Sequence, residues 1–284
     1  MAVFSGKGPL ARGFRRLHGA PSQPRGLYLL CWCLGSVLIV FLVVPLIALA
    51  LSPSASNLAS VARMADVRDA IVLSLEAAFL SATLAAMIGV PLAYALARTA
   101  FPGKGVIGAL IDLPLAVPHT VAGIALLMVF GRQGLFGAPL QAVGLRFWGT
   151  IGGIVIAMLF VSVPYTVNAA RIGFEAIDPR LEKIARTLGL GPWRTFARVT
   201  LPLARRSIMT GVTLTYARSI SEFGAVVILV YYPMTAPVKI YELFLRFGLE
   251  QSAAAAVLLL VVSLGLFMLL RALAQRGAPA QETR

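Results

Sequence analysis

Six long apolar segments decide what this chain can fold into. They cover approximately residues 27–51, 70–97, 105–131, 148–170, 207–232 and 252–270. Each is close to or above the roughly 20 residues that an α-helix needs to cross a bilayer. Runs of this length, without alternation of apolar and polar residues, exclude the strands of a closed barrel. We therefore predict an all-α, polytopic membrane protein.

The third and fifth segments are less regular than the others. The third contains Asp112, Pro114, Pro118 and His119, and the fifth contains Arg218 and Glu222. The sequence therefore predicts about six transmembrane helices and leaves five open. The composition agrees with a membrane environment, because only 13% of the residues are charged, against about 25% in soluble domains.

The basic residues predict the orientation. One set of loops, taken with both ends of the chain, holds 18 Lys and Arg residues, whereas the opposite loops hold 6 and Arg218 lies inside the fifth segment. Because basic loops remain in the cytoplasm, both termini are expected there, with the protein in the inner (cytoplasmic) membrane. The net charge of +14 is therefore a topology signal. It does not indicate a nucleic-acid surface, since no nucleic-acid-binding module accompanies it.

We expect one membrane domain. Residues 1–26 are a basic cytoplasmic segment, residues 27–274 the transmembrane domain with its core at 70–272, and residues 275–284 a cytoplasmic tail. The first apolar run exceeds the 7–15 residues of a signal-peptide core, so it should remain as a transmembrane helix. Cys31 and Cys33 both lie inside that run, where neither a disulfide to a loop nor a metal site is expected.

Residues 175–202 form the longest predicted cytoplasmic loop. Asp178 and Pro179 predict the start of a helix that runs to Gly189, with apolar residues on one face at Leu181, Ile184, Ala185 and Leu188. A second short helix follows Gly191 and Pro192. It is expected to carry Trp193, Phe196 and Ala197 on one side and Arg194 and Arg198 on the other, and to end at Leu201 and Pro202. An amphipathic hairpin lying in the lipid headgroups has the same shape and stays an alternative.

The spacing in this hairpin resembles the permease signature of bacterial and archaeal binding-protein-dependent ABC importers. In that signature an EAA triplet precedes a glycine, and nine residues later Ile-x-Leu-Pro follows; here the glycine is Gly189 and the final residues are Val199, Leu201 and Pro202. The triplet reads Lys183, Ile184 and Ala185, with Glu182 one position early. The resemblance implies that this coupling hairpin docks into a groove on a cytoplasmic ATPase. The residues it assigns to docking are Asp178, Glu182, Lys183, Ala185, Gly189, Val199, Leu201 and Pro202. Glu182 and Lys183 point in different directions around a helix, so the acidic contact stays open.

The rest of the chain, from about Ala70 to Ala272, resembles the sulfate, molybdate and tungstate branch of the same family. Two stretches carry this resemblance: Asp112 to Phe130, and Ala217 to Tyr241, whose Tyr231-Tyr232-Pro233-Met234 is most similar to molybdate and tungstate members. The resemblance implies the fold of a type I ABC importer permease and the import of molybdate or tungstate. Import of sulfate or thiosulfate is the alternative.

Ionisable groups at membrane depth are costly unless they face a partner or a cavity. Arg218 and Glu222 are four residues apart and can pair on one helix face. Either this pair is purely structural, or Arg218 and hydroxyls such as Ser219 and Ser221 donate hydrogen bonds to a passing oxyanion. Pro114 and Pro118 interrupt the third segment, and the lone His119 lacks further ligands for a metal site. The candidate translocation path consists of Pro118, His119, Thr120, Arg218, Ser221 and Glu222.

No phosphate-binding Gly-x-x-x-x-Gly-Lys-[Ser/Thr] loop is present, so we expect a transport subunit that is not an enzyme and binds no cofactor, with ATP on a partner subunit. The expected partners are cytoplasmic ABC ATPase subunits, a periplasmic or extracellular oxyanion-binding protein, membrane lipid and a second copy of the chain, or a different permease in its place. No nucleic acid is expected. A secondary anion transporter is the alternative, although it needs no docking hairpin.

Overall fold

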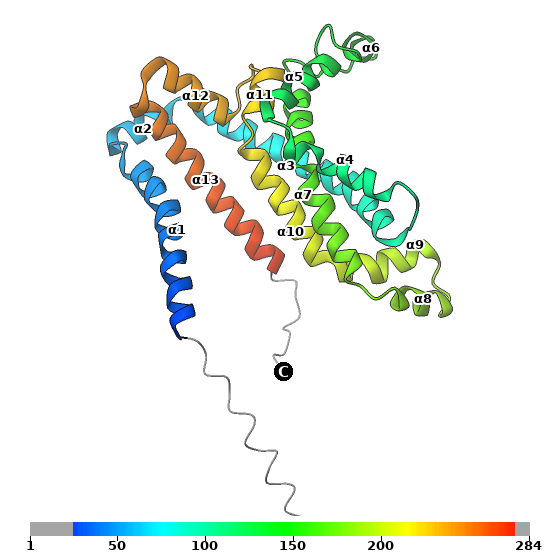
Figure 1. The fold of residues 1–284 in the computed structure, drawn as a ribbon. Helices are drawn as coiled ribbons and strands as arrows, with labels where there is room; N and C mark the ends of the chain where they lie inside the picture. The colour runs from blue at the N-terminus through cyan, green and yellow to red at the C-terminus, as the bar shows by residue number, and fades with distance from the viewer. Residues whose placement is uncertain (1–24, 276–284) are drawn as a thin grey trace, which may run out of the picture. The chain divides into compact units, whose positions relative to one another are not determined.

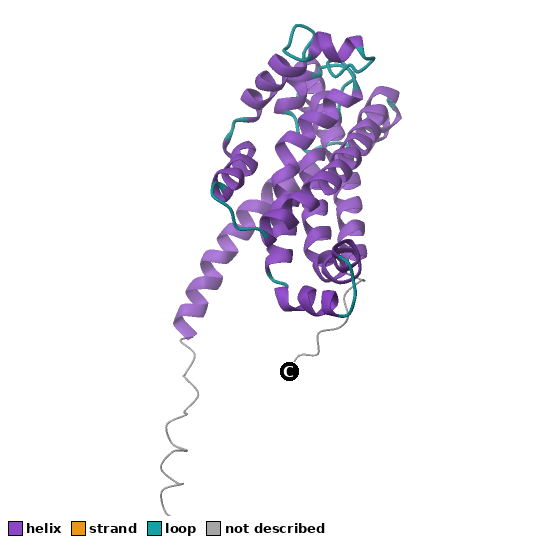
Figure 2. Ribbon diagram, turned by 90° about the vertical axis from the view of Figure 1, so that its right-hand side faces the viewer, coloured by secondary structure: helices purple, strands orange, loops and turns teal. Residues whose placement is uncertain are grey.

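The computed structural model describes residues 25–275, and these residues are helical or form loops between helices (Figure 2). The chain divides into two compact units, Met1–Leu51 and Ser52–Arg284. Most of the predicted basic segment 1–26 and of the predicted tail 275–284 lies outside the described residues.

The described part of the first unit is helix α1 (Arg25–Leu51), which agrees with the first predicted span. It is apolar on every side, and nearly all of its side chains are exposed. A helix that is hydrophobic all round is suited to contact with lipid.

The second unit contains the remaining helices (Figure 1). They are α2 (Ala55–Arg63), α3 (Ala65–Arg98), α4 (Lys104–Ala116), α5 (His119–Phe130), α6 (Gly137–Ala142), α7 (Ile151–Glu175), α8 (Pro179–Thr187), α9 (Pro192–Thr195), the π-helical turn η3 (Phe196–Thr200), α10 (Leu201–Ile220), α11 (Gly224–Leu229), α12 (Ala236–Phe247) and α13 (Leu249–Gln275).

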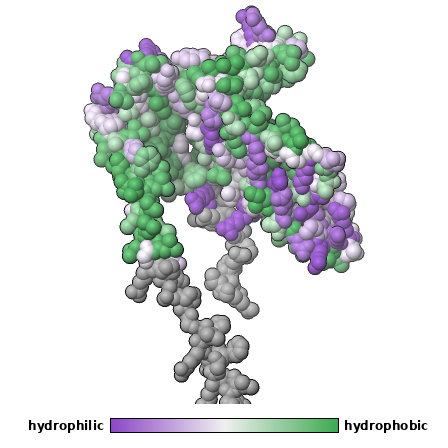
Figure 3. Space-filling view, in the orientation of Figure 1, coloured by the Kyte–Doolittle hydropathy of each residue, from purple (hydrophilic) through white to green (hydrophobic). Residues whose placement is uncertain are grey.

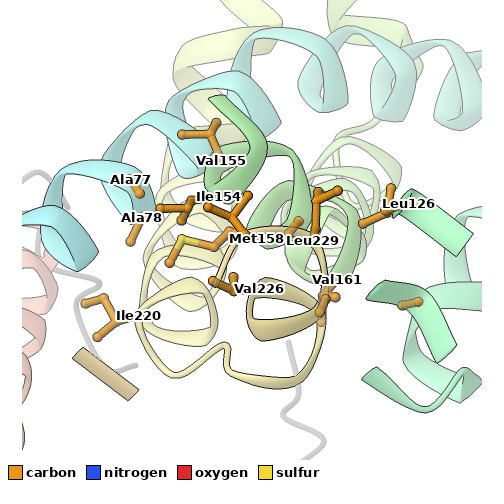
Figure 4. Close-up of a cluster of buried hydrophobic side chains, with 14 of the residues drawn as sticks. Ala77, Ala78, Leu126, Ile154, Val155, Met158, Val161, Ile220, Val226 and Leu229 are labelled. Carbon is orange, nitrogen blue, oxygen red and sulfur yellow. The ribbon is translucent and has the colours of Figure 1, made fainter. Parts of the chain in front are cut away.

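The core of this unit is built by α3, α7 and α10, which pack against one another. Buried side chains from α3 and α7 meet those of α11 in one apolar cluster, which includes Ala77, Ala78, Ile154, Met158 and Val226 (Figure 4). Many of the buried residues on α3 are alanine, glycine or serine. Small residues let helix backbones approach closely, which is how helices associate in membranes without a hydrophobic driving force.

A seam of hydroxyl groups also joins α3, α7 and α10. Ser219 on α10 lies 3.0 Å from the Oγ atom of Ser162 on α7 and 3.2 Å from that of Ser81 on α3, and all three are fully buried. Thr166 and Thr215 pair at 2.6 Å in the same seam. The alternative in which Ser219 donates a hydrogen bond to a passing oxyanion does not fit this arrangement, because its hydroxyl group is directed into the bundle.

The third predicted span, 105–131, forms two helices in the structure. Helices α4 and α5 meet at an angle of 112°, and the break falls at Val117 and Pro118. Pro114 lies within α4 and does not end it. The expected interruption is thus located at Pro118, where the proline ring removes a helical hydrogen bond.

The fifth predicted span, 207–232, is wrong as a single helix. Helix α10 ends at Ile220, and α11 begins only at Gly224. The physical reason is Glu222, whose Oε1 atom accepts a hydrogen bond from the backbone N–H of Ala225 at 2.8 Å and so starts a new helix. Within residues 25–275, four helices are long and apolar enough to cross a membrane, or five if the bent pair α4 and α5 is one span.

Helices α2, α12 and α13 pack together at the N-terminal end of α3, around Val61, Val67, Leu243 and Ala254. Lys239 on α12 is nearly buried there and forms ion pairs with Asp66 at 2.5 Å and with Glu242 at 2.6 Å. At the other end of α3, Arg98 contacts the loop that contains α8. Figure 3 shows hydrophilic side chains gathered at the end of the unit that holds α8 and α9.

Candidate coupling loop and translocation site

The predicted hairpin begins and turns where the sequence indicates. The side chain of Asp178 accepts a hydrogen bond from the N–H of Arg180 at 2.8 Å, and Pro179 opens α8. The helix closes with hydrogen bonds from Leu190 to Ala185 (3.1 Å) and from Gly189 to Arg186 (3.0 Å). Gly189 has a φ of +87°, a left-handed conformation that other residues rarely adopt. The glycine is therefore required by the way this helix ends.

The second predicted helix does not stop at Leu201 and Pro202. Instead, α9 passes into the π-helical turn η3, in which the N–H of Leu201 bonds to the carbonyl of Phe196, and then into α10. In a regular α-helix the ring of Pro202 would clash with the carbonyl group four residues earlier. Here Pro202 lies in the first turn of α10, directly after the π turn, and the chain continues as α10 into the bundle. Val199 and Leu201 are half-buried in this stretch.

Most of the apolar residues that the sequence places on one face of α8 are exposed. Leu181, Ile184 and Leu188 are exposed, whereas Ala185 and Glu182 are buried. Trp193 on α9 is 85% exposed. Beside it, a hollow of about 520 Å³ is lined by Pro91, Tyr94, Arg186, Pro192, Trp193 and Phe196. An exposed apolar surface of this kind is typical of a site that contacts another protein or the membrane.

Glu182 and Lys183 point in different directions, as their positions in the sequence predict. Lys183 is exposed. The carboxylate of Glu182 accepts hydrogen bonds from the Nε atom of Arg98 at 2.9 Å, from Thr200 at 3.1 Å and from Tyr94 at 3.3 Å. No local sequence signal connects Tyr94 and Arg98 with a residue more than 80 positions later, so these partners appear only in the folded chain.

The predicted path residues of α5 and α10 come together in a second cluster. The guanidinium group of Arg218 donates hydrogen bonds to Glu222 at 2.8 Å and to Ser221 at 3.2 Å, and it lies 2.8 Å from the Nε2 atom of His119. Glu222 is 1% exposed and Arg218 is half-buried, whereas His119 and Ser221 are exposed. The structure therefore places a charged pair at the boundary between the protein interior and an open surface.

Helix packing fixes the position of His119 in this cluster. A Cβ atom added at Gly224 would lie 2.8 Å from the Cβ of His119, so only glycine lets the start of α11 come this close to the start of α5. Pro118 and Thr120, on either side of His119, are exposed. All six predicted path residues thus lie at or beside two adjoining breaks, one between α4 and α5 and the other between α10 and α11.

The contact between His119 and Arg218 joins residues that are 99 positions apart, and the sequence offers no signal for it. Among the described residues, no three His, Cys, Asp or Glu side chains are grouped so that they could hold a metal ion. The guanidinium group of Arg218 and the hydroxyl groups of Ser221 and Thr120 can donate hydrogen bonds to an anion, whereas the Glu222 carboxylate is an acceptor.

Helices that are long and apolar enough to cross a membrane, with two adjoining breaks at which ionisable residues meet, are typical of membrane transport proteins. Residues 86–277 match the family described as binding-protein-dependent transport system inner membrane component. The chain belongs to this family, the membrane-spanning permeases of ABC importers. It is therefore a multi-pass membrane protein and a transport subunit that is not itself the ATPase. The alternative of a secondary anion transporter is set aside.

Relatives with reported names cover most of the chain. The molybdate/tungstate transport system permease protein WtpB of Thermococcus kodakarensis is 44% identical over 245 residues, which is 86% of this chain and 94% of that protein. The probable sulfate transport system permease protein cysT of Chlorokybus atmophyticus is 37% identical over 202 residues, 70% of each chain. The predicted family and branch are confirmed by these similarities.

The fold is similar to that of a bacterial alginate ABC transporter solved with a pentasaccharide-bound periplasmic protein. The TM-score is 0.73 with 17% sequence identity, over 89% of this chain and 95% of that one. At this identity the similarity concerns the fold alone, and it confirms the predicted importer permease fold.

Proposed function

We propose that this permease imports molybdate or tungstate. The observation that carries the proposal is the 44% identity, over 86% of the chain, to a relative named for these two anions. Sulfate is the second candidate, because a relative named for sulfate is 37% identical over 70% of the chain. All three are tetrahedral dianions, so the path itself has little chemistry with which to distinguish them.

The proposed contact with the anion is the cluster of Arg218, His119 and Ser221. A guanidinium group offers several hydrogen-bond donors to one oxyanion, and the exposed side chains of His119 and Ser221 face the open side of the cluster. Glu222 already binds the Nη2 atom of Arg218 at 2.8 Å. An oxyanion must therefore compete with this carboxylate, which keeps binding weak and allows release. Strong selection of the cargo then belongs to the binding protein.

The proposed energy source is ATP hydrolysis on separate ATPase subunits. The exposed side chains of Leu181, Ile184, Leu188 and Trp193 form a hydrophobic surface to which an ATPase can bind. Asp178, Gly189, Val199, Leu201 and Pro202 contribute to this docking site through the shape of the loop, and Lys183 through its exposed charge. The chain itself binds no cofactor in this proposal.

The proposed assembly is a homodimer, with the translocation path between its two copies, and both termini in the cytoplasm. A periplasmic or extracellular oxyanion-binding protein delivers the anion. When ATP closes the two ATPase subunits, the paired coupling loops move together and the path opens outward, which is alternating access. Lipid surrounds the apolar helices.

Reconstitution in liposomes tests this proposal. The permease is co-purified with candidate ATPases, and ATP hydrolysis is measured with a binding protein and molybdate, tungstate or sulfate in turn. We expect stimulation by a binding protein loaded with molybdate or tungstate. Stimulation by sulfate alone would make sulfate the cargo, and failure of every ATPase to bind would contradict the coupled mechanism.

A further inference from the structure

Glu182 holds an internal position that the docking role does not explain. Its side chain is 8% exposed, although it lies on a short helix at the surface of the protein. Its carboxylate is enclosed by Arg98, Tyr94 and Thr200, at 2.9, 3.3 and 3.1 Å. A carboxylate whose acceptor sites are occupied in this way is poorly placed to bind a second protein.

The partners of Glu182 come from different elements. Tyr94 and Arg98 lie in the last turns of α3, and Thr200 closes the π turn that leads into α10. Arg98 also donates a hydrogen bond to the carbonyl oxygen of Ile177, just before α8, at 3.2 Å. The Arg98 guanidinium group therefore holds both the start and the first turn of the coupling hairpin.

The same helix contacts α10, the helix that carries Arg218. Seventeen residues before Arg98, Ser81 lies 3.2 Å from the hydroxyl group of Ser219, the neighbour of Arg218. At 1.5 Å per residue, this part of α3 is about 25 Å long. Along the way Gly89 packs so closely on α7 that an added Cβ atom would lie 2.9 Å from Val167. This packing supports α3 where Pro91 removes one of its hydrogen bonds.

We propose that Tyr94, Arg98, Glu182 and Thr200 form a tie that fastens the coupling loop to α3, so that loop and helix move together toward the anion site. In this proposal Glu182 and Arg98 are positioning residues. Glu182, which the sequence assigns to docking, does not touch the ATPase. The apolar surface of α8 and α9 receives the force, and the tie passes it to α3. The inference rests on the proposed function.

Two other roles for the pair are distinguishable. If Glu182 contacts the ATPase, its loss weakens the complex between the two proteins. If the pair only stabilises the fold, replacing both members by neutral groups should restore function together with stability, because the cost of a broken buried pair comes from the charge left behind. A tie that transmits movement predicts a third pattern, in which stability and docking recover while coupling does not.

The test uses Arg98→Met, Glu182→Gln, the double variant and Arg98→Lys in the full permease. The control is Arg171→Met with Glu175→Gln, an ion pair of 2.9 Å on α7 that is 34% and 41% exposed. We expect the double variant to melt as the parent does and to retain the ATPase. Stimulation of ATP hydrolysis by the loaded binding protein, and uptake, should fall about tenfold. Arg98→Lys keeps a positive charge beside Glu182, so its stimulation and uptake should fall less than those of the double variant. The control should behave as the parent.

Hydrogen exchange on the permease alone gives a readout that needs no ATPase. We expect the amides of α8 to exchange faster in the double variant, while those of α3 around Ser81 remain unchanged. Normal stimulation and unchanged α8 exchange in the double variant would overturn the tie. Loss of the ATPase from the Glu182→Gln complex would instead make Glu182 a docking residue. If the parent protein binds no ATPase, the proposed function fails, and the exchange experiment still decides whether the tie exists.

Discussion

At the residue scale, Arg218 and Glu222 combine a structural and a functional role. Glu222 is fully buried and bonds both to Arg218 and to the backbone of α11. Removal of one member of such a buried pair leaves the other charge buried without a partner, which lowers the stability of the fold by about 3–5 kcal/mol. Single substitutions therefore report on folding before they report on transport.

The double variant Arg218→Met with Glu222→Gln separates the two roles. The new amide side chain keeps an oxygen for the N–H of Ala225, and no buried charge remains unpaired, so we expect nearly normal thermal stability. Uptake should fall about tenfold or more, because a hydrogen bond to a charged group contributes about 1.5–3 kcal/mol. Melting temperature and uptake are measured on the same preparation. Transport at the parental rate would show that Arg218 does not contact the anion.

At the element scale, the turn after α8 depends on one backbone conformation. Gly189 is left-handed, and a Cβ atom added there would meet no atom within 4 Å. Its replacement therefore has a conformational cost and no steric one. Asparagine and aspartate tolerate this conformation better than most residues, and they have nearly the same shape.

Gly189→Asn and Gly189→Asp form a matched pair that isolates charge at the docking surface. We expect both variants to insert in the membrane with a loss of stability of about 1 kcal/mol or less. The aspartate should weaken co-purification of the ATPase or abolish its coupling, because it places a charge beside the apolar side chain of Leu188. Normal uptake by the aspartate variant would show that Gly189 and its turn are not part of the docking surface.

The ion pairs of α12 predict a dependence of stability on pH. Hydrogen bonds from Lys239 and Arg246 lower the pKa of Glu242 below its ordinary value. A carboxyl group with a lowered pKa in the folded state stabilises the protein above its unfolded pKa and loses this contribution as the pH falls through the folded value. Stability should therefore decline below about pH 4.3, the ordinary glutamate pKa.

The measurement is the melting temperature in detergent between neutral and acid pH. Glu242→Gln should lower stability at pH 7 by about 1–2 kcal/mol and should flatten the decline on the acid side. Glu175→Gln, in the exposed pair on α7, is the matched control and should change little. An unchanged acid profile in Glu242→Gln would show that other carboxyl groups cause the decline.

At the scale of the whole molecule, α3 separates two ends of different character. Arg98 meets the coupling loop at one end, and Asp66 meets Lys239 of α12 at the other. Those contacts group the basic loops as the charge count predicts, with residues 98–104 and 176–200 at one end. The orientation proposed for the protein follows from the larger number of basic residues at this end.

Cysteine labelling tests this orientation. With Cys31 and Cys33 replaced by serine, Leu188→Cys and Leu135→Cys provide reporters that are 79% and 72% exposed in the parent. A membrane-impermeant maleimide added outside intact cells should label position 135 and leave position 188 unlabelled until the membrane is permeabilised. The reverse pattern would invert the proposed topology and place the coupling loop away from any cytoplasmic ATPase.

The sequence by itself determined the features that depend on neighbouring residues. The length of the apolar runs predicts helices, and Asp178, Pro179 and Gly189 predict the bounds of α8, because caps and left-handed turns are decided within one helical turn. The signature spacing indicates the family for the same local reason. Lys183 and Glu182 diverge as a helix requires.

Only the tertiary structure decided which distant groups meet. Glu182 faces Arg98, His119 faces Arg218 and Ser219 faces Ser81, and each contact depends on how far one helix is rotated against another. That rotation is set by close packing of small residues across three helices, which no local pattern records. The break between α10 and α11 belongs here too, since the buried Glu222 that starts α11 lies in an apolar run that reads as one span.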